Sequence, residues 1–454
     1  MSMESIIEVL LRYNVNAPRY TSYPPANFFD EVKEDTPIES IWRDSNALFP
    51  EALSFYFHVP FCNKRCYFCG CTSENLKEES YVEAYFAALY SEMDKKLEWI
   101  SKERKVHQIH FGGGTPTSVP TVYLKSVIDR LKELFEFTDF VEVAIECNPA
   151  TVTEELLLEL REAGFNRVSY GIQDFNLKVL KKIGREPSLL PVPYLVDFSK
   201  KIGFKSVNLD LIYGLPGQNQ EVFLDSVHKT IEANPERVAL FSYAHVPWVR
   251  PEQKVLDSYV IPSARDKMRF FLNARAIFME AGYLEVGMDH FVKPSDSLGI
   301  AAKTASLHRN FQGYCTRETT GQVYAFGSSA ISQLDNAYLQ NTKNTSEYIR
   351  TVRQGLKTEI KVHELSVTEK MYRDMIERLM CNHSLKVSAK EKELLGNKWG
   401  VLCALAKDEL VEVLSDHEIV ATELGRLVIR FVASKMDPLL DSGANNEGVF
   451  SKTI

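Results

Sequence analysis

Half of the cysteines of this chain lie within one ten-residue stretch, which indicates where its chemistry takes place. Cys62, Cys66, Cys69 and Cys71 form this group, whereas Cys147, Cys315, Cys381 and Cys403 are scattered over the rest of the chain. Thiolates this close repel one another unless a positive centre holds them together. The clustering therefore predicts a metal site.

The Cys-x3-Cys-x2-Cys spacing of the first three cysteines favours an iron–sulfur cluster. Such clusters take thiolates from compact loops, and three thiolates on a four-iron cluster would leave one iron open to a ligand. A closed structural zinc site needs four ligands, usually from two halves apart in sequence, and no second half is present. Cys71 could complete a zinc site, although the Cys-Gly-Cys spacing leaves little room for both cysteines to bind one small ion. Plain thiols or disulfides are the remaining alternative.

A second stretch that could bind a ligand is the glycine run Gly112, Gly113 and Gly114, followed by Thr115. Glycines allow close approach of the backbone, and free N–H groups there could hold an anion such as a carboxylate. Taken alone, a triple glycine could equally be a tight turn.

The elements that must position these residues alternate between strand and helix. β-branched or aromatic runs predict strands over residues 53–59, 106–111, 140–146, 167–172, 205–212 and 237–244. Amphipathic stretches predict helices over residues 81–100, 122–135, 153–163, 192–202, 220–233 and 264–281. Six βα units in series predict an α/β fold with a parallel, barrel-like sheet. Gly164, Gly203 and Gly282 fit left-handed caps at three of the helix ends.

Polar residues stand at the carboxyl ends of the predicted strands. Cys62 follows the first strand, the glycine run follows the second, Glu146 ends the third, Gln173 follows the fourth, Asp210 lies late in the fifth and Ala244 closes the sixth. The carboxyl ends of the strands of a βα barrel converge on one face, where catalysis takes place. We therefore expect these residues to meet above the cysteines; a salt-bridge network within the barrel is the alternative for the charged ones.

Composition limits the classes of protein to which the chain can belong. With 454 residues and 45% apolar content it can bury a large core in more than one domain. A net charge of −8 argues against general binding to nucleic acids or anionic membranes. No apolar run approaches the length of a membrane span, and the first residues lack the basic start of a secretory signal. The expected location is a reducing, cytoplasmic compartment.

The last part of the chain reads as a separate small helical domain. Helices are predicted over residues 366–380, 391–406 and 425–436, with a β-hairpin over residues 410–422 that turns at residues 415–417. Helices with one hairpin suggest a winged-helix-like domain. Acidic residues outnumber basic ones there, so a role as a lid or packing module is preferred over DNA binding.

With Tyr56, His58, Pro60 and Cys71, the cysteine motif resembles the oxygen-independent coproporphyrinogen-III oxidases (dehydrogenases) of haem biosynthesis, which are radical S-adenosylmethionine (SAM) enzymes. Further matching stretches are residues 18–24, 110–117, 164–174, 210–216, 288–291 and 308–314. The resemblance covers nearly the whole chain.

The resemblance implies a partial (β/α)6 barrel, one 4Fe-4S cluster held by Cys62, Cys66 and Cys69, and two molecules of SAM. It implies SAM contacts at Tyr56, Phe68, Gly113, Gly114, Thr115, Glu146, Gln173, Arg185, Asp210, Ala244 and Ile331. Arg185 suits the SAM carboxylate because a guanidinium pairs with a carboxylate through two hydrogen bonds. Tyr56 and Cys71 are the expected catalytic residues. Ile212 could pack on adenine, although a strand residue of this type is usually core.

The implied reaction is the oxidative decarboxylation of two propionates of coproporphyrinogen III to vinyl groups, which gives protoporphyrinogen IX. An electron donor such as flavodoxin or a reductase is expected as a partner, and the protein is expected to be a monomer. The expected domains are residues 1–35 (an extension over the active site), 36–360 (the catalytic barrel and its extension) and 361–454 (the helical domain). His58, His290 and His308 could move protons, and Arg19 and Arg309 could anchor propionates.

Two other functions stay open at this point. One is a haem chaperone on the same scaffold, although such relatives usually carry an aromatic residue where this chain has Cys71. The other is a zinc-stabilised binding protein with a winged-helix recognition domain.

Overall fold

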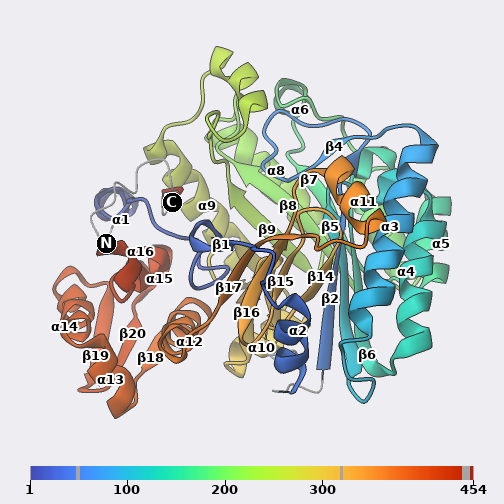
Figure 1. Ribbon diagram of the computed structural model, residues 1–454. Coiled ribbons are helices and arrows are strands. Elements are labelled where there is room, and N and C mark those ends of the chain that lie inside the picture. Colours follow the sequence, from blue (N-terminus) through green and yellow to red (C-terminus); the bar gives the residue numbers. More distant parts are fainter. Residues whose placement is uncertain (1, 48–51, 317–320, 442–449, 453–454) are drawn as a thin grey trace.

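The computed structural model describes residues 2–47, 52–316, 321–441 and 450–452. Its centre is a nine-stranded sheet with the order β10-β11-β9-β8-β7-β6-β5-β2-β14 (Figure 1). The six central strands are mutually parallel: β2 (Ala52–Val59), β5 (Lys105–Gly113), β6 (Phe137–Cys147), β7 (Arg167–Gln173), β8 (Ser206–Tyr213) and β9 (Arg237–Ser242). The predicted strands and their parallel arrangement are confirmed, except that the last strand ends before Ala244.

The two edges of this sheet were not predicted. β14 (Tyr324–Phe326) adds a parallel strand beside β2, although it comes from a distant part of the chain. On the other edge, β11 (His290–Val292) pairs antiparallel with β9, and β10 (Leu284–Val286) pairs antiparallel with β11. The sheet is therefore mixed, and it remains open over the residues that the structure describes, since β10 and β14 are its two ends.

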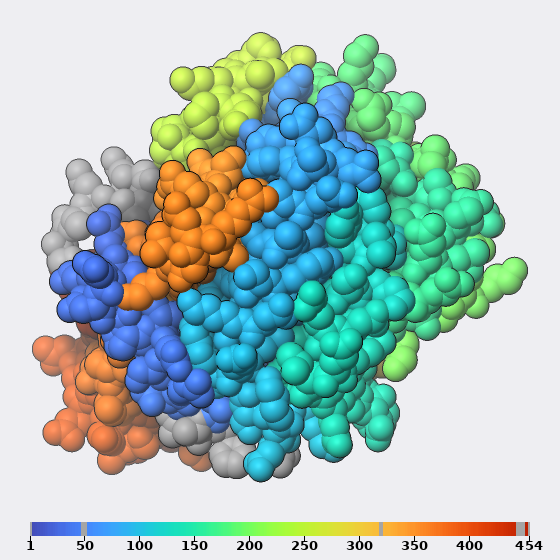
Figure 2. All heavy atoms as spheres, turned by 45° about the vertical axis from the view of Figure 1, so that its right-hand side comes forward, coloured from blue at the N-terminus to red at the C-terminus, as the bar shows by residue number. Residues whose placement is uncertain are grey.

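Helices between the strands cover the outer face of the sheet. They are α3 (Glu79–Leu97), α4 (Thr121–Leu134), α5 (Glu154–Ala163), α7 (Val192–Lys201), α8 (Gln220–Ala233) and α9 (Ala264–Glu280), close to the predicted ranges. Gly164, Gly203 and Gly282 end three of them with φ of +106°, +101° and +85°, so the predicted left-handed caps are confirmed. In Figure 2, α11 (Thr345–Arg353, orange) lies against α3 (blue), with which it is in contact.

Side chains of the central strands alternate between an apolar outer face and a polar inner face. In β2, Leu53, Phe55 and Phe57 are fully buried in the main core, whereas Ser54, Tyr56 and His58 alternate with them along the strand. This alternation follows from the two-residue repeat of a strand. It brings the polar side chains of neighbouring strands onto one surface, inside the curve of the sheet.

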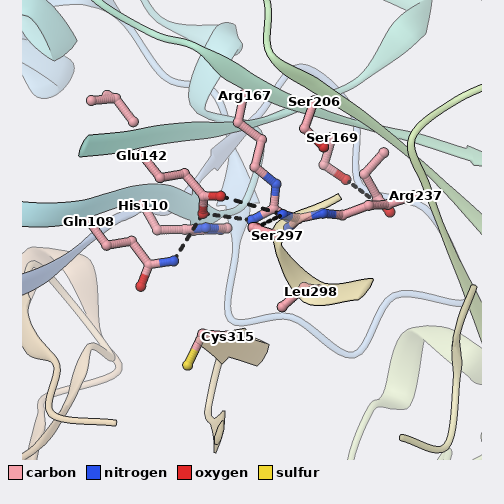
Figure 3. Close-up of polar contacts among 12 residues, drawn as sticks. Gln108, His110, Glu142, Arg167, Ser169, Ser206, Arg237, Ser297, Leu298 and Cys315 are labelled. Carbon is pink, nitrogen blue, oxygen red and sulfur yellow. Dashed lines mark hydrogen bonds and ion pairs between the residues drawn. The ribbon is translucent and has the colours of Figure 1, made fainter. Parts of the chain in front are cut away.

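An ionic network occupies this inner face away from the strand ends (Figure 3). The carboxylate of Glu142 accepts hydrogen bonds from Gln108 at 3.0 Å and Arg167 at 2.8 Å, and Arg237 pairs with Asp296 at 2.7 Å. Although burial opposes ionisation, Arg167 and Arg237 hold the pKa of Glu142 at about 2. Each of these buried charges thus has a partner of opposite charge, which offsets the free-energy cost of removing it from water.

Smaller elements surround the inner face. They are β1 (Asp30–Glu31), β15 (Ile331–Gln333), β16 (Ala337–Asn341) and β17 (Glu359–Glu364) in one four-stranded sheet, the hairpin β12 (Leu307–Asn310) and β13 (Gly313–Thr316), and the helices α2 (Ile38–Ala47), α6 (Leu177–Lys182) and α10 (Ser297–Lys303). No helix among the described residues is long and apolar enough to cross a membrane.

The C-terminal part combines helices with a three-stranded antiparallel sheet. Its elements are α12 (Val367–Asn382), β18 (Ser384–Lys386), α13 (Ala389–Leu395), α14 (Asn397–Ala404), β19 (Val411–Ser415), β20 (Glu418–Ala421), α15 (Glu423–Leu427) and α16 (Ile429–Ser434). The predicted hairpin is confirmed as β19 and β20. The single helix predicted over residues 391–406 is wrong, because Gly396 takes a φ of +51° and divides it. The helix predicted over residues 425–436 is likewise divided, at Val428.

The first residues of the chain pack on this C-terminal part. Ile7 and Leu10 of α1 (Met3–Arg12) belong to the same apolar cluster as residues of α12 and α16. The hydroxyls of Tyr20 and Tyr23 donate to Asp437 at 3.0 and 3.2 Å. Met1 and residues 442–449 and 453–454, which belong to the expected terminal domains, lie outside the described residues.

Candidate active site

The cysteine loop leaves the carboxyl end of β2 and is closed at its base by a short parallel pair. β3 (Phe61–Cys62) enters the loop and β4 (Glu74–Asn75) leaves it, with Cys62 opposite Asn75. Cys62, Cys66 and Cys69 are partly exposed and all three are free thiols. The first strand therefore delivers the three predicted ligands to the end of the sheet, as expected.

Hydrogen bonds to two neighbouring segments hold the loop in place over the sheet. The N–H of Tyr67 donates to the carbonyl of Ile183 at 3.0 Å. The buried amide of Gln253, in the 3-10 helix η4 (Pro251–Ser258), donates to the carbonyls of Phe68 at 3.0 Å and Ala244 at 3.3 Å. The loop is thus tied to segments that follow β7 and β9.

Each predicted ligand receives a hydrogen bond from a different donor. The hydroxyl of Thr115 lies 3.6 Å from Cys62 Sγ, Nη1 of Arg185 lies 3.4 Å from Cys66 Sγ, and the N–H of Cys71 lies 3.4 Å from Cys69 Sγ. Donors to sulfur favour the thiolate, which is the form that binds iron, and they tune a bound cluster.

These residues fit a 4Fe-4S cluster. Among the described residues, no three His, Cys, Asp or Glu side chains converge on the position of a single metal ion. A multi-iron cluster does not need that convergence, because each thiolate binds a different iron. The three thiols are partly exposed, lie on one anchored loop and each have a hydrogen-bond donor of their own. They can therefore bind three different irons of one cluster.

The glycine run is required by close approach of neighbouring strands. An added Cβ would lie 2.7 Å from the Glu146 carboxylate at Gly112, 2.5 Å from the His58 ring at Gly113, and 2.6 Å from a backbone carbonyl at Gly114. Gly113 also has a φ of +113°. The three glycines therefore let the ends of β2, β5 and β6 pack together.

Of the two interpretations of this run, free N–H groups for an anion are not found at Gly113, Gly114 or Thr115. The N–H of Gly114 donates to the carbonyl of Val59 and that of Thr115 to the carbonyl of Phe61, both at 2.7 Å. The N–H of Gly113 donates to the Glu146 carboxylate. An anion cradle built from these amides is thus already filled by groups of the protein itself.

Tyr56 and His58 form a chain of hydrogen bonds on the inner face of β2. Nε2 of His58 lies 2.9 Å from the carbonyl of Thr72, which can only accept, so Nε2 carries the proton. Nδ1 then accepts from the hydroxyl of Tyr56 at 3.1 Å. Burial lowers the pKa of His58, which keeps the ring neutral. His58 therefore fixes Tyr56 and the returning end of the cysteine loop.

Two carboxylates with different environments lie on β6 and β8. Glu146 accepts from Nε2 of His110 at 3.0 Å; although burial opposes ionisation, this bond keeps the pKa of Glu146 below its usual value. Burial and the nearby Glu146 charge raise the pKa of Asp210 to about 6. Asn208 donates to Asp210 at 2.7 Å and orients it. Both carboxylates can accept hydrogen bonds from hydroxyl or amino groups of a ligand.

Gln173 and Arg185 meet beside the cysteine loop. Gln173 ends β7 with a φ of +67°, a strained conformation for a side chain of this type. Its buried Oε1 has no hydrogen-bond partner among the described residues. An added Cβ at Gly171 would lie 2.6 Å from the Gln173 amide and 3.0 Å from the Arg185 guanidinium. A strained residue with an unsatisfied polar atom is typical of a ligand site.

The remaining predicted contacts, Phe68, Ala244, Ile331 and Cys71, lie in different environments. Phe68 is partly buried against a cluster that includes Ile212, so Ile212 is a core residue as expected. Ala244 is exposed just beyond β9. Ile331 lies in the separate four-stranded sheet, although the hydroxyl of nearby Ser329 is 3.2 Å from Nε2 of His58. Cys71 is exposed, and its N–H is the donor to Cys69.

The other charged candidates lie outside this group of residues. Nδ1 of His290 lies 2.7 Å from Asp289, and His308 pairs with Glu377 of α12. Arg309 is buried over the ring of Tyr314, with its charge centre 4.6 Å from the ring centroid. Arg19 is exposed and lines a cavity with Asp289 and Ala244. Arg309 is not among the residues that line this cavity.

Several residues that build the site were not singled out in the sequence. They are His110, Asn208, Gln253 and Ser329, each of which holds another site residue in place. Strand alternation could have identified His110 and Asn208, because they share the inner face with Tyr56 and Asp210. No local signal marks Gln253 or Ser329, since their partners lie far away in sequence.

Comparisons with known proteins agree with this geometry. A family model described as the radical SAM superfamily matches residues 56–229. The chain is similar to the oxygen-independent coproporphyrinogen III oxidases of Synechocystis sp. (34% identity over 100% of this chain and 99% of that protein) and Salmonella typhimurium (36% identity over 99% of this chain and 98% of that protein). A solved structure of coproporphyrinogen III oxidase from Escherichia coli, described as a radical SAM enzyme, superposes with a TM-score of 0.86 at 35% identity, over 95% of this chain and 98% of that one.

Proposed function

The chain belongs to the oxygen-independent coproporphyrinogen III oxidases of the radical SAM superfamily, and on this premise we propose how its residues carry out that reaction. Each of two propionates of coproporphyrinogen III loses carbon dioxide, one hydrogen atom from its β-carbon and one further electron, which passes to an external electron acceptor, without using oxygen. The products are vinyl groups, and the porphyrinogen formed is protoporphyrinogen IX. The observation that carries the proposal is the meeting of the three donor-supported thiols with Gln173 and Arg185 at the strand ends.

Cys62, Cys66 and Cys69 would hold the 4Fe-4S cluster and leave one iron for SAM. When bound, the reduced cluster and SAM supply a 5′-deoxyadenosyl radical that can take a hydrogen atom from the β-carbon of a propionate. Thr115, Arg185 and the N–H of Cys71 support the three thiolates through their hydrogen bonds. The protein's own part is to bind, orient and shield the reactants.

SAM would be held by residues from several strand ends and loops. The proposed contacts are Tyr56, Phe68, Gly113, Gly114, Thr115, Glu146, Gln173, Arg185, Asp210, Ala244 and Ile331. The unsatisfied Oε1 of Gln173 and the two inward carboxylates supply acceptors for ammonium and ribose hydroxyl groups. Arg185 supplies a donor for a carboxylate. We propose two SAM molecules in all.

Tyr56 and Cys71 are the proposed catalytic residues. The hydroxyl of Tyr56 donates to the neutral ring of His58, which holds the phenol in one orientation on the inner face. Cys71 is exposed within the cysteine loop and would act on substrate or on a transferred proton. His58 is a positioning residue, because it acts through Tyr56 and the loop.

The remaining proposals concern the whole protein. We propose a partial (β/α)6 barrel within residues 36–360, an N-terminal extension over the active site in residues 1–35, and a winged-helix-like domain in residues 361–454. The lining of a strand-end cavity by Arg19 supports the role of the extension. We further propose a cytoplasmic monomer that receives electrons from flavodoxin or a reductase; the free thiols suit a reducing compartment.

An oxygen-free incubation tests the proposed function. The reconstituted protein is mixed with SAM, a reductant and coproporphyrinogen III, and the products are separated by chromatography. We expect porphyrinogens with one and two vinyl groups together with 5′-deoxyadenosine. Cleavage of SAM without any vinyl product would contradict the substrate assignment, and binding of haem without either product would instead favour a chaperone.

A further inference from the structure

A cavity of about 490 Å³ lies at the carboxyl ends of β8 and β9, next to the proposed SAM contact Ala244. This volume is within the range of small-molecule sites. Its apolar lining includes Tyr213, Tyr243 and Trp248. Trp248 is 64% exposed, an unusual exposure for so large an apolar ring. The cavity therefore offers an aromatic surface beside the proposed reaction centre.

The charges that line the cavity are mostly positive. Arg19, Lys267, Arg430 and Lys452 contribute cations, and Asp289 is the carboxylate among the lining residues. The chain as a whole has a net charge of −8, so this concentration of cations departs from the average of the molecule. Cations gathered in a concave site attract anionic ligands.

Lys267 of α9 is a partly buried cation in this lining. Its Nζ donates to the carbonyl of Tyr243 at 2.5 Å, and no carboxylate of the described residues lies within ion-pairing distance of it. Burial lowers its pKa to about 8. An added Cβ at Gly214 would lie 2.3 Å from Cε of Lys267. The missing side chain at position 214 thus leaves room for the lysine to cross the end of β8.

The two arginines that line the cavity, Arg430 and Arg19, differ in their roles. All three nitrogens of the Arg430 guanidinium donate to backbone carbonyls, including those of Pro18 and Lys452, so Arg430 fixes the walls of the cavity. Arg19 makes no hydrogen bond or ion pair with the part of the chain that the structure describes, and its side chain is available to a ligand. Asp289 is already hydrogen-bonded to His290 at 2.7 Å.

We propose that this cavity binds carboxylate arms of the porphyrinogen substrate, with Lys267 as the inner contact, Arg19 as the outer contact and the aromatic residues along the ring. The inference rests on the proposed function and names the residues that select a polycarboxylate. An apolar ring with carboxylate arms matches a lining of aromatic side chains and unpaired cations. The carboxylate of a SAM molecule has the same chemistry and is the competing source of the ligand.

Equilibrium binding separates these two ligands without requiring turnover. The full chain is titrated with coproporphyrin III, a stable oxidised ring with the same four propionates, and in parallel with its tetramethyl ester and with SAM. For Lys267→Met we expect about a tenfold higher Kd for coproporphyrin III, because one charge-assisted contact is lost. The Kd for the ester and for SAM should not change, and Lys267→Arg should restore binding.

Lys254→Met is the matched control, because Lys254 is an exposed lysine of the neighbouring η4 that does not line the cavity. It should bind coproporphyrin III like the wild type. Unchanged coproporphyrin binding by Lys267→Met would overturn the inference, as would a rise in the Kd for SAM alone. Wild-type protein that forms no vinyl product refutes the proposed reaction instead, whatever the binding data show.

Discussion

At the scale of single residues, hydrogen bonds to three sulfurs support the proposed cluster ligands. Thr115 comes from the glycine run, Arg185 follows β7, and the N–H of Cys71 comes from the loop itself. The cysteine spacing predicts the ligands because three thiols in a short loop are a local signal. It does not predict the donors, since Arg185 reaches Cys66 from 119 positions away.

Cysteine substitutions separate ligands from neighbours. We expect Cys66→Ala to lower bound iron and sulfide to background, because a cluster with two protein thiolates is poorly held. Cys71→Ala should retain full iron but reduce vinyl formation, since Cys71 is a proposed catalytic residue and not a ligand. Metal analysis of anaerobically purified protein measures the first effect. Cys403→Ala, at a half-buried cysteine of α14, is the control and should change neither the iron content nor vinyl formation. Full iron in Cys66→Ala would refute the ligand assignment.

Asp210 illustrates a conflict between stability and ligand binding. Its pKa is raised to about 6, so the folded protein binds this proton more tightly than the unfolded chain does. The corresponding stability is fully present below the unfolded pKa of about 3.9 and is lost as the pH rises through 6. At pH 8 the buried charge therefore destabilises the ligand-free protein.

Asp210→Asn should remove that penalty. We expect the ligand-free variant to be about 1–3 kcal/mol more stable than the wild type at pH 8, with the difference shrinking toward pH 4. Its affinity for SAM should fall at the same time, because a carboxylate acceptor is lost. Urea unfolding at both pH values and SAM titration measure the two effects. A variant that is less stable than the wild type at pH 8 would contradict the burial argument.

At the scale of elements, the alternation of strands and helices positions the site. The strand and helix patterns are strong because each central strand alternates apolar and polar residues and each outer helix has one apolar face. The pattern places His110 and Asn208 on the same face as Tyr56. It fails where single residues decide the backbone, as at Gly396, and where strands pair over long distances, as β14 does with β2.

The 3-10 helix η4 is the element that fastens the cysteine loop. Gln253→Leu would leave the carbonyls of Phe68 and Ala244 without this donor and the N–H of Val246 without its acceptor at 2.6 Å. Each unsatisfied buried group costs about 1–3 kcal/mol, so the loop should open more often. We expect iron to be lost to a chelator severalfold faster than in the wild type. Gln220→Leu, at an exposed glutamine that begins α8, should release iron at the wild-type rate; equal rates in both variants would exclude this role for Gln253.

At the scale of the whole molecule, the two ends of the chain pack together beside the strand-end cavity. Tyr20 and Tyr23 donate to Asp437, and Arg430 donates to the carbonyls of Ala17 and Pro18. The sequence predicts an N-terminal extension only through family resemblance, because its fixed points are pairs of residues more than 400 positions apart. Such contacts leave no periodic signal.

Asp437→Ala should loosen the extension. Two buried tyrosine hydroxyls lose their acceptor, at a cost of about 2–4 kcal/mol in the free energy of unfolding. Hydrogen exchange of residues 13–23 should quicken, and the Kd for coproporphyrin III should rise because Arg19 is no longer held. Asp441→Ala removes an ion pair with Lys398 whose carboxylate is 64% exposed, and should change stability by less than about 0.5 kcal/mol. Equal exchange rates in the two variants would exclude Asp437 as the anchor.

We propose above all that Cys62, Cys66 and Cys69 hold a cluster with one iron open to SAM. Electron paramagnetic resonance of the anaerobically reconstituted, reduced full chain, recorded with and without SAM, tests it most directly. We expect a cluster signal whose line shape changes when SAM binds the open iron. No signal after reduction, or a signal that SAM leaves unchanged, would contradict it.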